Sequence, residues 1–378
     1  MARKFGKKNI VNLDPLAYNT MLIGESGIGK TTVIKEFCEK LAGEDGYIFL
    51  NTGKEDGYQA IQGLVYEEIR DYAGYVEVIN DIIENRFTDY ADLKVVVIDT
   101  YDELVPLAEK ESVRLHNKAH PDKRVDSINA AWGGFGKGED KAIELILNPL
   151  WDLKDVGVHF IIIGHTKKKD IDDTVTGISY TTLTNNLSQK YFNAIKTKVQ
   201  FLGVAYIDRE IVKEKTGKKN IVNGKEEIKG FIKNESRVIR FRDDTYSVDS
   251  KSRFSDIVDC IPLNSDALIT AIKDAIYAEY VKGGKTVEQG KVEQAASDAA
   301  SEAVQKELSA NAKAKRSEEE KAARKVELFN LIQTTFPDAS EENKTAAKKI
   351  LAENGCKKFS DEGLSVEAME LIAKTLKG

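Results

Sequence analysis

The sequence has few cysteines, few tryptophans and no long apolar run. Its three cysteines, Cys38, Cys260 and Cys356, lie far apart in 378 residues, which excludes a disulfide framework and a C-x-x-C metal pair. That usage is typical of a reducing compartment. No apolar run reaches the roughly 20 residues of a membrane span, and no apolar signal core follows the basic first residues. We therefore expect a cytoplasmic protein with no membrane partner.

The charge is nearly balanced. The chain has 56 Lys+Arg against 62 Asp+Glu, a net charge of -6, which excludes an overall basic coat for nucleic acid but permits a local basic patch. Hydrophobic residues make up 41% of the chain, enough for a sizeable core. The length fits two or three domains.

Short apolar runs alternate with amphipathic segments over the first three quarters of the chain. The runs are residues 19–23, 47–51, 94–99, 158–164 and 201–206. Nearly continuous apolar runs suit strands that are buried on both faces of a parallel sheet. The alternation predicts an α/β fold with a mostly parallel sheet. Residues 210–242 then alternate charged and apolar residues around Asn223 and Gly224, which predicts an antiparallel hairpin at one edge of that sheet.

The composition changes again near residue 283, and we predict three parts. Residues 1–282 form the α/β core. Residues 283–324 are rich in Ala, Glu, Lys and Ser and have no aromatic residue, which predicts a charged helical or flexible linker. Residues 325–378 regain apolar residues in three segments and predict a small helical module.

The strongest motif is G-x-x-x-x-G-K-T, placed between a predicted strand and a predicted helix. Glycines there allow backbone N–H groups to surround phosphate oxygens, and the helix N-terminus adds a partial positive charge. We expect Lys30 to reach the β- and γ-phosphates of ATP and Thr31 to bind Mg²⁺. The predicted nucleotide-binding residues are Gly24, Glu25, Ser26, Gly27, Ile28, Gly29, Lys30, Thr31 and Thr32.

Asp99 ends the apolar run at residues 94–99. Ligands of open α/β sheets bind at the carboxyl ends of the strands, so we expect Asp99 to hold Mg²⁺. Many P-loop ATPases place a catalytic glutamate directly after this aspartate, but the chain has Thr100 there. The candidates for the hydrolytic base are Glu103, which we prefer, Asp102 and Glu55.

Another apolar run ends at Gly164 and His165. A polar side chain at that strand end can touch the γ-phosphate and report hydrolysis, so His165 is a candidate site residue. His116 and His120 are four residues apart, but no third ligand lies near them in the sequence. That spacing alone does not predict a metal site.

The order of these motifs resembles that of phage RecA-like P-loop ATPases of the Sak type, which are single-strand annealing proteins related to RecA and RadA. The resemblance rests on the loop, Asp99-Thr100, Trp132-Gly133 and Gly164-His165, and covers about residues 15–280. It implies a RecA-like core, ATP hydrolysis and, for a phage-encoded chain, the host cytoplasm. RecA relatives usually carry a catalytic glutamate after the second strand, where this chain has residues 51–53, Asn-Thr-Gly.

Lys251, Arg253 and Phe254 resemble the K-x-R-F element of RadA-like and DnaB-like ATPases, whose Lys and Arg act on the neighbouring subunit's nucleotide. Alternate residues of an extended segment point the same way, so Lys251 and Arg253 suit a phosphate clamp. The resemblance therefore implies a homo-oligomer, either a ring or a filament, with nucleotide at the subunit interfaces.

A nucleic-acid surface is predicted after His165. Residues 167–169 are lysines, and a polar loop at residues 185–190 precedes Tyr191 and Phe192. Lysines bind phosphates and aromatic rings stack on bases, and the loop after this strand contacts DNA in RecA relatives. Asp170, Asp172 and Asp173 offset the charge of the lysines, so a solvated loop is the alternative.

We therefore expect an ATP- and Mg²⁺-dependent enzyme that acts on single-stranded DNA in recombination or annealing. The C-terminal module is expected to bind another protein. One alternative is a helicase loader or a helicase-like motor. Another is an assembly protein that ATP switches between states with little turnover.

Overall fold

The computed structural model describes residues 11–53, 56–172, 177, 179–219, 226–241, 251–284 and 286–377. Within these ranges ten strands form one sheet, whose main path runs β10-β8-β7-β1-β5-β4-β2-β3. The strands are β1 Thr20–Gly24, β2 Tyr47–Asn51, β3 Tyr66–Glu68, β4 Val95–Asp99, β5 His159–Asp172, β6 Ser179–Asn185, β7 Phe201–Lys219, β8 Glu226–Arg240, β9 Lys251–Ser252 and β10 Cys260–Pro262.

The centre of the sheet is parallel. Strand β1 pairs in parallel with β5 and β7, and β4 pairs in parallel with β5 and β2. All five residues of β1 and of β4 are buried, as expected for a sheet that helices cover on both faces. The register aligns Gly24 with His165 and Asp99 with Ile163. The carboxyl ends of β1, β4 and β5 therefore meet at one edge.

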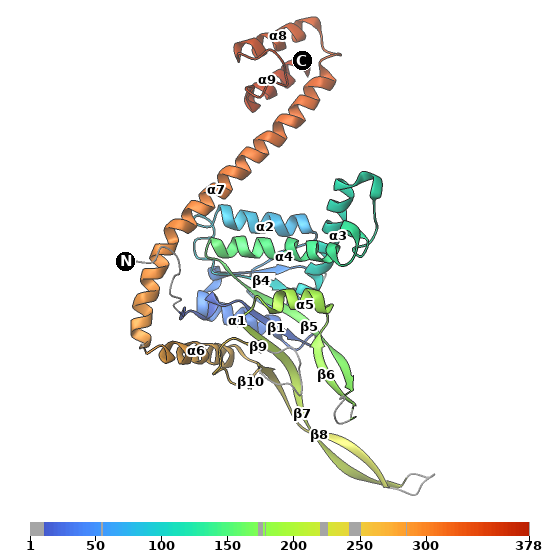
Figure 1. Cartoon of the computed structure of the whole chain (residues 1–378), viewed down its shortest axis with the longest axis vertical. Helices are drawn as coiled ribbons and strands as arrows, with labels where there is room; N and C mark the ends of the chain where they lie inside the picture. The colour runs from blue at the N-terminus through green and yellow to red at the C-terminus, as the bar shows by residue number, and fades with distance from the viewer. Residues whose placement is uncertain are drawn as a thin grey trace. The chain divides into compact units, whose positions relative to one another are not determined.

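Helices lie on both faces of the sheet (Figure 1). Helices α1 and α6 pack together on one face, and α2, α3 and α4 pack together on the other. The helices of this unit are α1 Lys30–Ala42, α2 Tyr72–Glu84, α3 Tyr101–Ala119, α4 Lys137–Asp155, α5 Gln189–Lys196 and α6 Ser265–Lys282.

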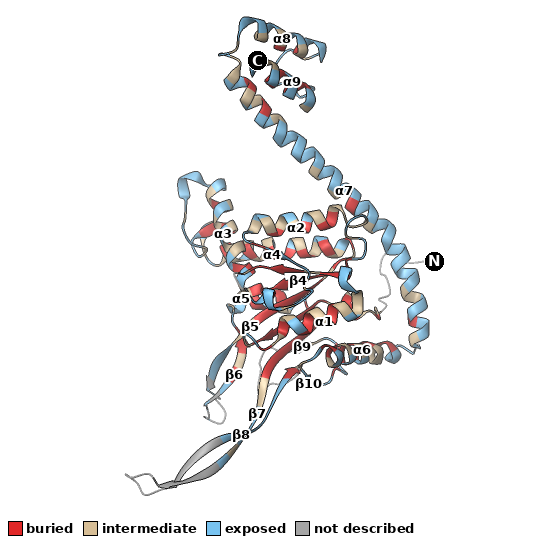
Figure 2. Cartoon of the chain, turned by 180° about the vertical axis from the view of Figure 1, so that it is seen from behind, coloured by how far each residue is buried: buried red, intermediate tan, exposed pale blue. Residues whose placement is uncertain are grey.

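The core follows the apolar faces of these helices. Val33, Ile34 and Phe37 of α1 pack in one cluster with Leu268 and Ile272 of α6 and with side chains from the central strands. Figure 2 shows that the buried residues gather in the sheet and on the helix faces that contact it. The spacing of the three α1 residues puts them on one side of a helix, so burying them fixes the direction in which α1 leaves the phosphate loop.

The edge hairpin predicted from residues 210–242 is confirmed. Strands β7 and β8 pair antiparallel from Val204 and Arg240 out to Lys219 and Glu226, and the hairpin extends well beyond the helices (Figure 1). The predicted turn at Asn223 and Gly224 lies outside the described residues. The predicted α/β class, with a mostly parallel sheet and an antiparallel edge, is therefore confirmed.

The chain divides into two compact units after Lys306. Helix α7, Val287–Thr335, contributes to both. In the first unit, the backbone at Gly290 packs closely on Leu13 and Tyr280, and the ammonium group of Lys306 lies 5.5 Å from the ring centroid of Phe87. The division after Lys306 does not test the boundaries at residues 282 and 324, which stay predictions from the sequence.

The second unit is helical. The end of α7 packs with α8, Glu341–Glu353, and α9, Val366–Lys377, around a core of its own that includes Leu328, Ile332 and Ile372. The predicted helical character of the C-terminal region is confirmed. No helix among the described residues combines the length and the apolar character that a membrane crossing requires.

Candidate functional site: a phosphate loop at the carboxyl edge of the sheet

The predicted phosphate loop lies between β1 and α1. Gly27 and Gly29 have φ angles of 74° and 109°, a region that suits glycine. Gly24 has a different reason to be glycine, because a Cβ there would lie 2.6 Å from the carbonyl oxygen of Ala205 on β7. Neighbouring strands thus leave no room for a side chain where the loop begins.

Lys30 holds the loop from within. Its side chain is buried, and Nζ donates hydrogen bonds to the carbonyl oxygens of Gly24, at 3.0 Å, and of Glu25, at 2.9 Å. The ammonium group therefore lies beside the residues that were predicted to bind phosphate.

Thr31 and Asp99, the two predicted magnesium ligands, are in contact. Oγ1 of Thr31 donates to Oδ2 of Asp99 at 2.8 Å, and Asp99 is buried. A hydroxyl and a carboxylate are the oxygen donors that Mg²⁺ prefers, and Mg²⁺ usually takes few protein ligands and adds water and substrate phosphates. The pair fits that ion. No larger cluster of His, Cys, Asp or Glu able to hold a metal occurs among the described residues.

A cavity of about 470 Å³ joins the loop to these groups. Its lining residues include Ser26, Lys30, Thr31, Asp99, Thr100 and His165. The hydroxyl of Thr100 is buried and has no hydrogen-bond partner in the described part of the chain. It can therefore form a hydrogen bond with a ligand in the cavity. Three strand ends therefore supply one site, as the sequence predicted.

Asp102 fixes the position of His165. The backbone N–H of His165 donates to Oδ2 of Asp102 at 2.8 Å, and Nδ1 of the His165 ring lies 3.6 Å from the same oxygen. The Asp102 side chain is 9% exposed. Asp102 was predicted as an alternative base, and the structure places it behind His165 instead.

Tyr58 is a lining residue that the sequence analysis missed. It lies on the short helix η3, Asp56–Ala60, and its hydroxyl donates to the carbonyl oxygen of Asp99 at 3.2 Å. Gly57, Ala60 and Ile61 line the same cavity. The segment after β2 has no motif in the sequence, so only the structure shows that it closes one side of the site.

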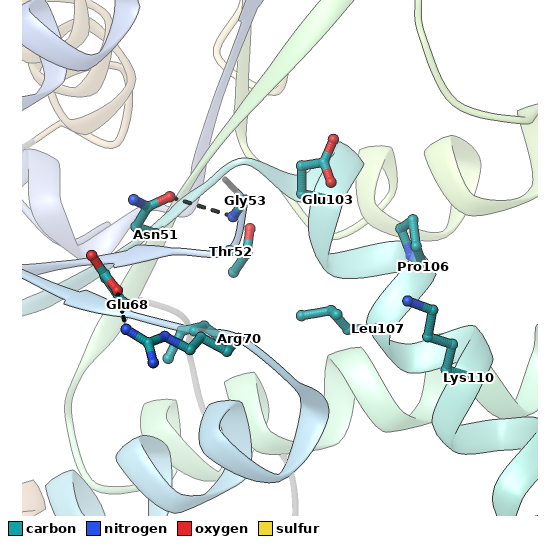
Figure 3. Close-up of a pocket in the computed structure, with 10 residues that line it drawn as sticks. Asn51, Thr52, Gly53, Glu68, Arg70, Glu103, Pro106, Leu107 and Lys110 are labelled. Atoms are coloured by element: carbon teal, nitrogen blue, oxygen red, sulfur yellow. Dashed lines mark hydrogen bonds and ion pairs between the residues drawn. The ribbon is translucent and has the colours of Figure 1, made fainter. Parts of the chain in front are cut away.

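Glu103, the preferred base, faces a second cavity, of about 640 Å³. Figure 3 shows it there together with Asn51, Thr52 and Gly53. It does not line the cavity that holds Lys30 and Asp99. The structure therefore does not bring Glu103 together with the phosphate loop, although both lie at the same edge of the sheet. Glu55 lies outside the described residues.

Arg253 lies near the amino ends of the central strands, whereas the phosphate loop lies at their carboxyl ends. Lys251 and Ser252 form β9, which pairs with Leu202 and Phe201, and Phe201 aligns with Thr20 at the start of β1. A rise of about 3.3 Å per residue puts the two ends of β1 roughly 13 Å apart. The guanidinium of Arg253 donates to the carbonyl oxygen of Thr197 at 2.7 Å. Arg253 is thus separated from the phosphate loop of its own chain.

The predicted nucleic-acid segment is a hairpin rather than a loop. Strand β5 continues past His165 and pairs antiparallel with β6 from Thr166 and Asn185 outward. Lys167, Lys168 and Lys169 are exposed on β5, as a phosphate-binding surface requires.

The stacking role predicted for Tyr191 and Phe192 is wrong. Both side chains are buried in α5. The Tyr191 hydroxyl donates to Glu109 at 2.7 Å, and burial, together with that carboxylate, raises the pKa of Tyr191 well above its ordinary value. An amphipathic helix turns both rings toward the core, where they cannot reach a base.

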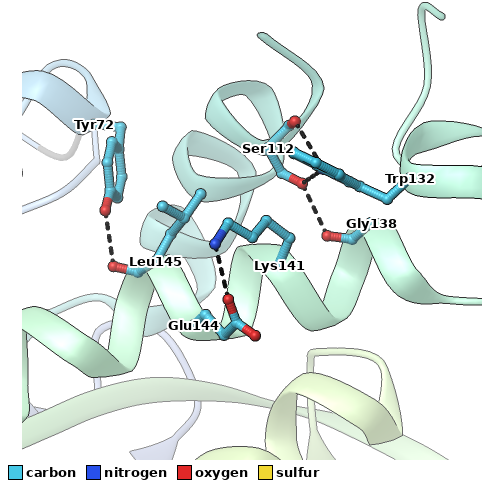
Figure 4. A network of polar contacts seen from close by, with 7 residues as sticks. All are labelled: Tyr72, Ser112, Trp132, Gly138, Lys141, Glu144 and Leu145. Atoms are coloured by element: carbon cyan, nitrogen blue, oxygen red, sulfur yellow. Dashed lines mark hydrogen bonds and ion pairs between the residues drawn. The ribbon is translucent and has the colours of Figure 1, made fainter. Parts of the chain in front are cut away.

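His116 and Trp132 have structural roles. The backbone N–H of Trp132 donates to Nδ1 of His116 at 3.1 Å, and the indole Nε1 donates to the carbonyl oxygen and the hydroxyl of Ser112 at 3.2 Å. Figure 4 shows how Ser112 in turn joins this loop to Gly138 at the start of α4. These contacts hold the turn at Trp132 against α3 and α4.

One comparison with known proteins shows the family of this chain. The AAA domain family matches residues 17–254, which contain the loop, Asp99, His165 and Arg253. The chain belongs to the AAA domain family. No curated protein sequence matches it. Among solved structures, the flagellar accessory protein FlaH from Methanocaldococcus jannaschii is similar, with 9% sequence identity and a TM-score of 0.29 over 62% of this chain and 81% of that chain. A similarity of that degree carries no functional argument.

This AAA-domain protein therefore carries a P-loop ATPase domain, and its predicted nucleotide and magnesium residues lie together. The position of Lys30, Thr31 and Asp99 around one cavity is what the family's chemistry requires.

Proposed function

We propose that this AAA-domain protein hydrolyses ATP and couples hydrolysis to single-stranded DNA, in phage-type recombination or annealing. The observation that carries the proposal is the course of β5. This strand places His165 at the nucleotide cavity and, two to four residues later, exposes Lys167, Lys168 and Lys169 on the hairpin. One strand thus connects the site where phosphate would leave to a surface that suits a nucleic-acid backbone.

The residues of the chain have separate tasks in this reaction. The loop amides and Lys30 bind and orient the phosphates, and Thr31 and Asp99 would hold Mg²⁺, which neutralises charge on the phosphates when bound. His165, held by Asp102, is the side chain that we assign to the γ-phosphate and the attacking water. His165 lines the cavity that holds Lys30 and Asp99, whereas Glu103 lines the neighbouring cavity.

The proposed active form is a head-to-tail homo-oligomer. Arg253 lies near the amino ends of the central strands, and the phosphate loop lies at their carboxyl ends. Its side chain could therefore enter the nucleotide site of a neighbouring subunit but not the site of its own chain. An arginine supplied in trans stabilises charge in the transition state of phosphoryl transfer. The recombination role itself rests on the order of motifs in the sequence.

The test is the ATPase rate with and without single-stranded DNA, measured on the full chain alongside its oligomer size. We expect stimulation by DNA in the wild type, and loss of that stimulation when Lys167, Lys168 and Lys169 are all replaced by alanine. The matched control replaces Lys40, Lys273 and Lys282, on α1 and α6, and should retain it. ATP-dependent oligomers that ignore DNA would instead favour a nucleotide-switched assembly protein.

A further inference from the structure

Arg237 has a backbone that is fixed on both sides. It lies on β8, where it aligns with Ile207 of β7, and its carbonyl oxygen accepts from the N–H of Leu263 at 2.9 Å. The next two residues, Val238 and Ile239, are buried. Arg237 therefore marks the rigid base of the β7–β8 hairpin.

The side chain of Arg237 reaches the phosphate loop. Its Nη1 donates to the carbonyl oxygen of Ile28 at 3.1 Å, and the same nitrogen would lie 3.9 Å from a Cβ built on Gly29. Ile28 and Gly29 directly precede Lys30, in the part of the loop whose amides surround phosphate in this motif. Gly29 lines the nucleotide cavity and Arg237 does not, so the guanidinium lies beside the cavity and would turn toward the phosphates when nucleotide binds. β8 thus supplies a cation to a loop that is more than 200 residues earlier in the chain.

The charge of Arg237 is available to a ligand. Arg237 is exposed, and the part of the chain that the structure describes places no carboxylate within ion-pair distance of it. Its neighbour on the same hairpin, Arg209, is instead paired with Glu235 at 2.7 Å. A guanidinium has five N–H donors, so the bond to Ile28 leaves donors for a second partner.

We propose that Arg237 binds the phosphates of the nucleotide in cis. This inference rests on the proposed nucleotide site and adds a ligand to it. A nucleoside triphosphate carries more negative charge than Lys30 and one Mg²⁺ neutralise, and arginine binds phosphate oxygens through paired donors. Arg253 has a different proposed role, because it lies near the amino ends of the central strands and is assigned to the site of a neighbouring subunit.

The two arginines should differ in their effects. Loss of a cis phosphate ligand weakens binding of both ADP and ATP, whether or not the protein assembles. Loss of the trans arginine weakens hydrolysis and leaves binding nearly intact. Nucleotide affinity therefore separates the two roles.

The experiment compares full-length wild type, Arg237→Ala, Arg237→Gln and Arg209→Ala. Fluorescent ADP and a non-hydrolysable fluorescent ATP analogue report the dissociation constants, and thermal unfolding without nucleotide reports the fold. We expect Arg237→Ala to bind about ten-fold more weakly or worse, the range of a hydrogen bond to a charged group. Arg209→Ala should bind like wild type.

Arg237→Gln separates support of the loop from binding of phosphate. Glutamine keeps an N–H donor for Ile28 but has no charge, so weaker binding with an unchanged unfolding temperature supports the proposal. Wild-type affinity in Arg237→Gln, or in a folded Arg237→Ala, overturns it. Wild-type protein that binds neither nucleotide would overturn the proposed function itself, which is a different result.

Discussion

Oγ1 of Thr31 donates to Oδ2 of Asp99 at 2.8 Å, across 68 residues of sequence. This contact joins the first turn of α1 to the end of β4, and it places the two predicted magnesium ligands side by side before any ion arrives. Asparagine at position 99 would keep an acceptor for Thr31 but lose the charge.

We therefore predict that Asp99→Asn folds normally and loses the effect of Mg²⁺ on hydrolysis. The ATPase rate should fall about 100-fold or more, because the metal contributes several kcal/mol to stabilising charge in the transition state. Titrating Mg²⁺ against the rate measures this. Asp122→Asn, at an exposed aspartate, is the control, and a normal Mg²⁺ response in Asp99→Asn would remove Asp99 from the metal site.

Lys30→Ala is expected to abolish hydrolysis and to weaken ATP binding strongly. The ammonium group is the buried cation of the loop and also bonds the carbonyl oxygens of Gly24 and Glu25. Lys40→Ala changes an exposed residue of the same helix, whose partner is Asp266, and should behave like wild type. ATPase activity of the wild-type level in Lys30→Ala would contradict the nucleotide assignment.

Arg253→Ala should bind ATP almost normally but hydrolyse it slowly, since an arginine supplied in trans contributes about 10³–10⁵ in rate. Mixing this variant with Lys30→Ala gives the sharper measurement. Each variant alone should be nearly inactive, and the mixture should recover part of the activity, because some interfaces pair an intact loop with an intact Arg253. An assembled Arg253→Ala protein with a normal rate would show that the residue has no such role.

Two truncations test where the first unit ends. We expect residues 1–282 to fold and bind nucleotide, and residues 1–306 to unfold at a higher temperature. The longer chain retains the part of α7 that covers Leu13 and Tyr280 at Gly290, and burial of apolar area stabilises by about 25 cal/mol per Å². Thermal unfolding of both chains decides this, and equal unfolding temperatures would mean that α7 adds nothing to the core.

His159 gives a pH prediction. Burial, with help from the nearby charge of Lys154, lowers the pKa of His159 to about 4, whereas an unfolded histidine titrates near 6.5. Between these values the unfolded chain binds the proton and the folded chain does not, so stability falls as the pH drops through this window. His159→Gln should lose less stability between pH 6.5 and 4 than wild type. The exposed His120, replaced by glutamine, is the control, and equal pH dependence in wild type and His159→Gln would contradict this account.

The parts of the site that follow strand ends were predictable from sequence. Gly24, Asp99 and His165 each end an apolar run, and parallel strands bring such ends to one edge. Tyr58 and Arg237 could not be found in this way, because their positions depend on how η3 and β8 pack against the loop. The cavity that Glu103 lines depends on how α3 packs beside the segment that follows β2, which the sequence does not show.

The hairpin after His165 does not show in the sequence pattern for a related reason. Residues 166–172 are mostly polar, and a two-stranded ribbon in solvent has no apolar face to produce a strand pattern. Tyr191 and Phe192 directly follow a polar segment in the sequence, which suggests exposed rings. Their burial follows instead from the short amphipathic helix α5. The apolar face of that helix packs on the core, and this packing decides where the two rings lie, whatever the polarity of the preceding residues.

The separation of Arg253 from the phosphate loop gives any head-to-tail assembly a polarity. Each subunit would donate an arginine at one end and receive one at the other, so an open chain always has a terminal subunit whose site lacks its arginine. A closed ring has no such end. Activity per subunit would therefore rise with the length of a filament and be independent of size for rings. Measuring the ATPase rate against oligomer size would distinguish a filament from a closed ring.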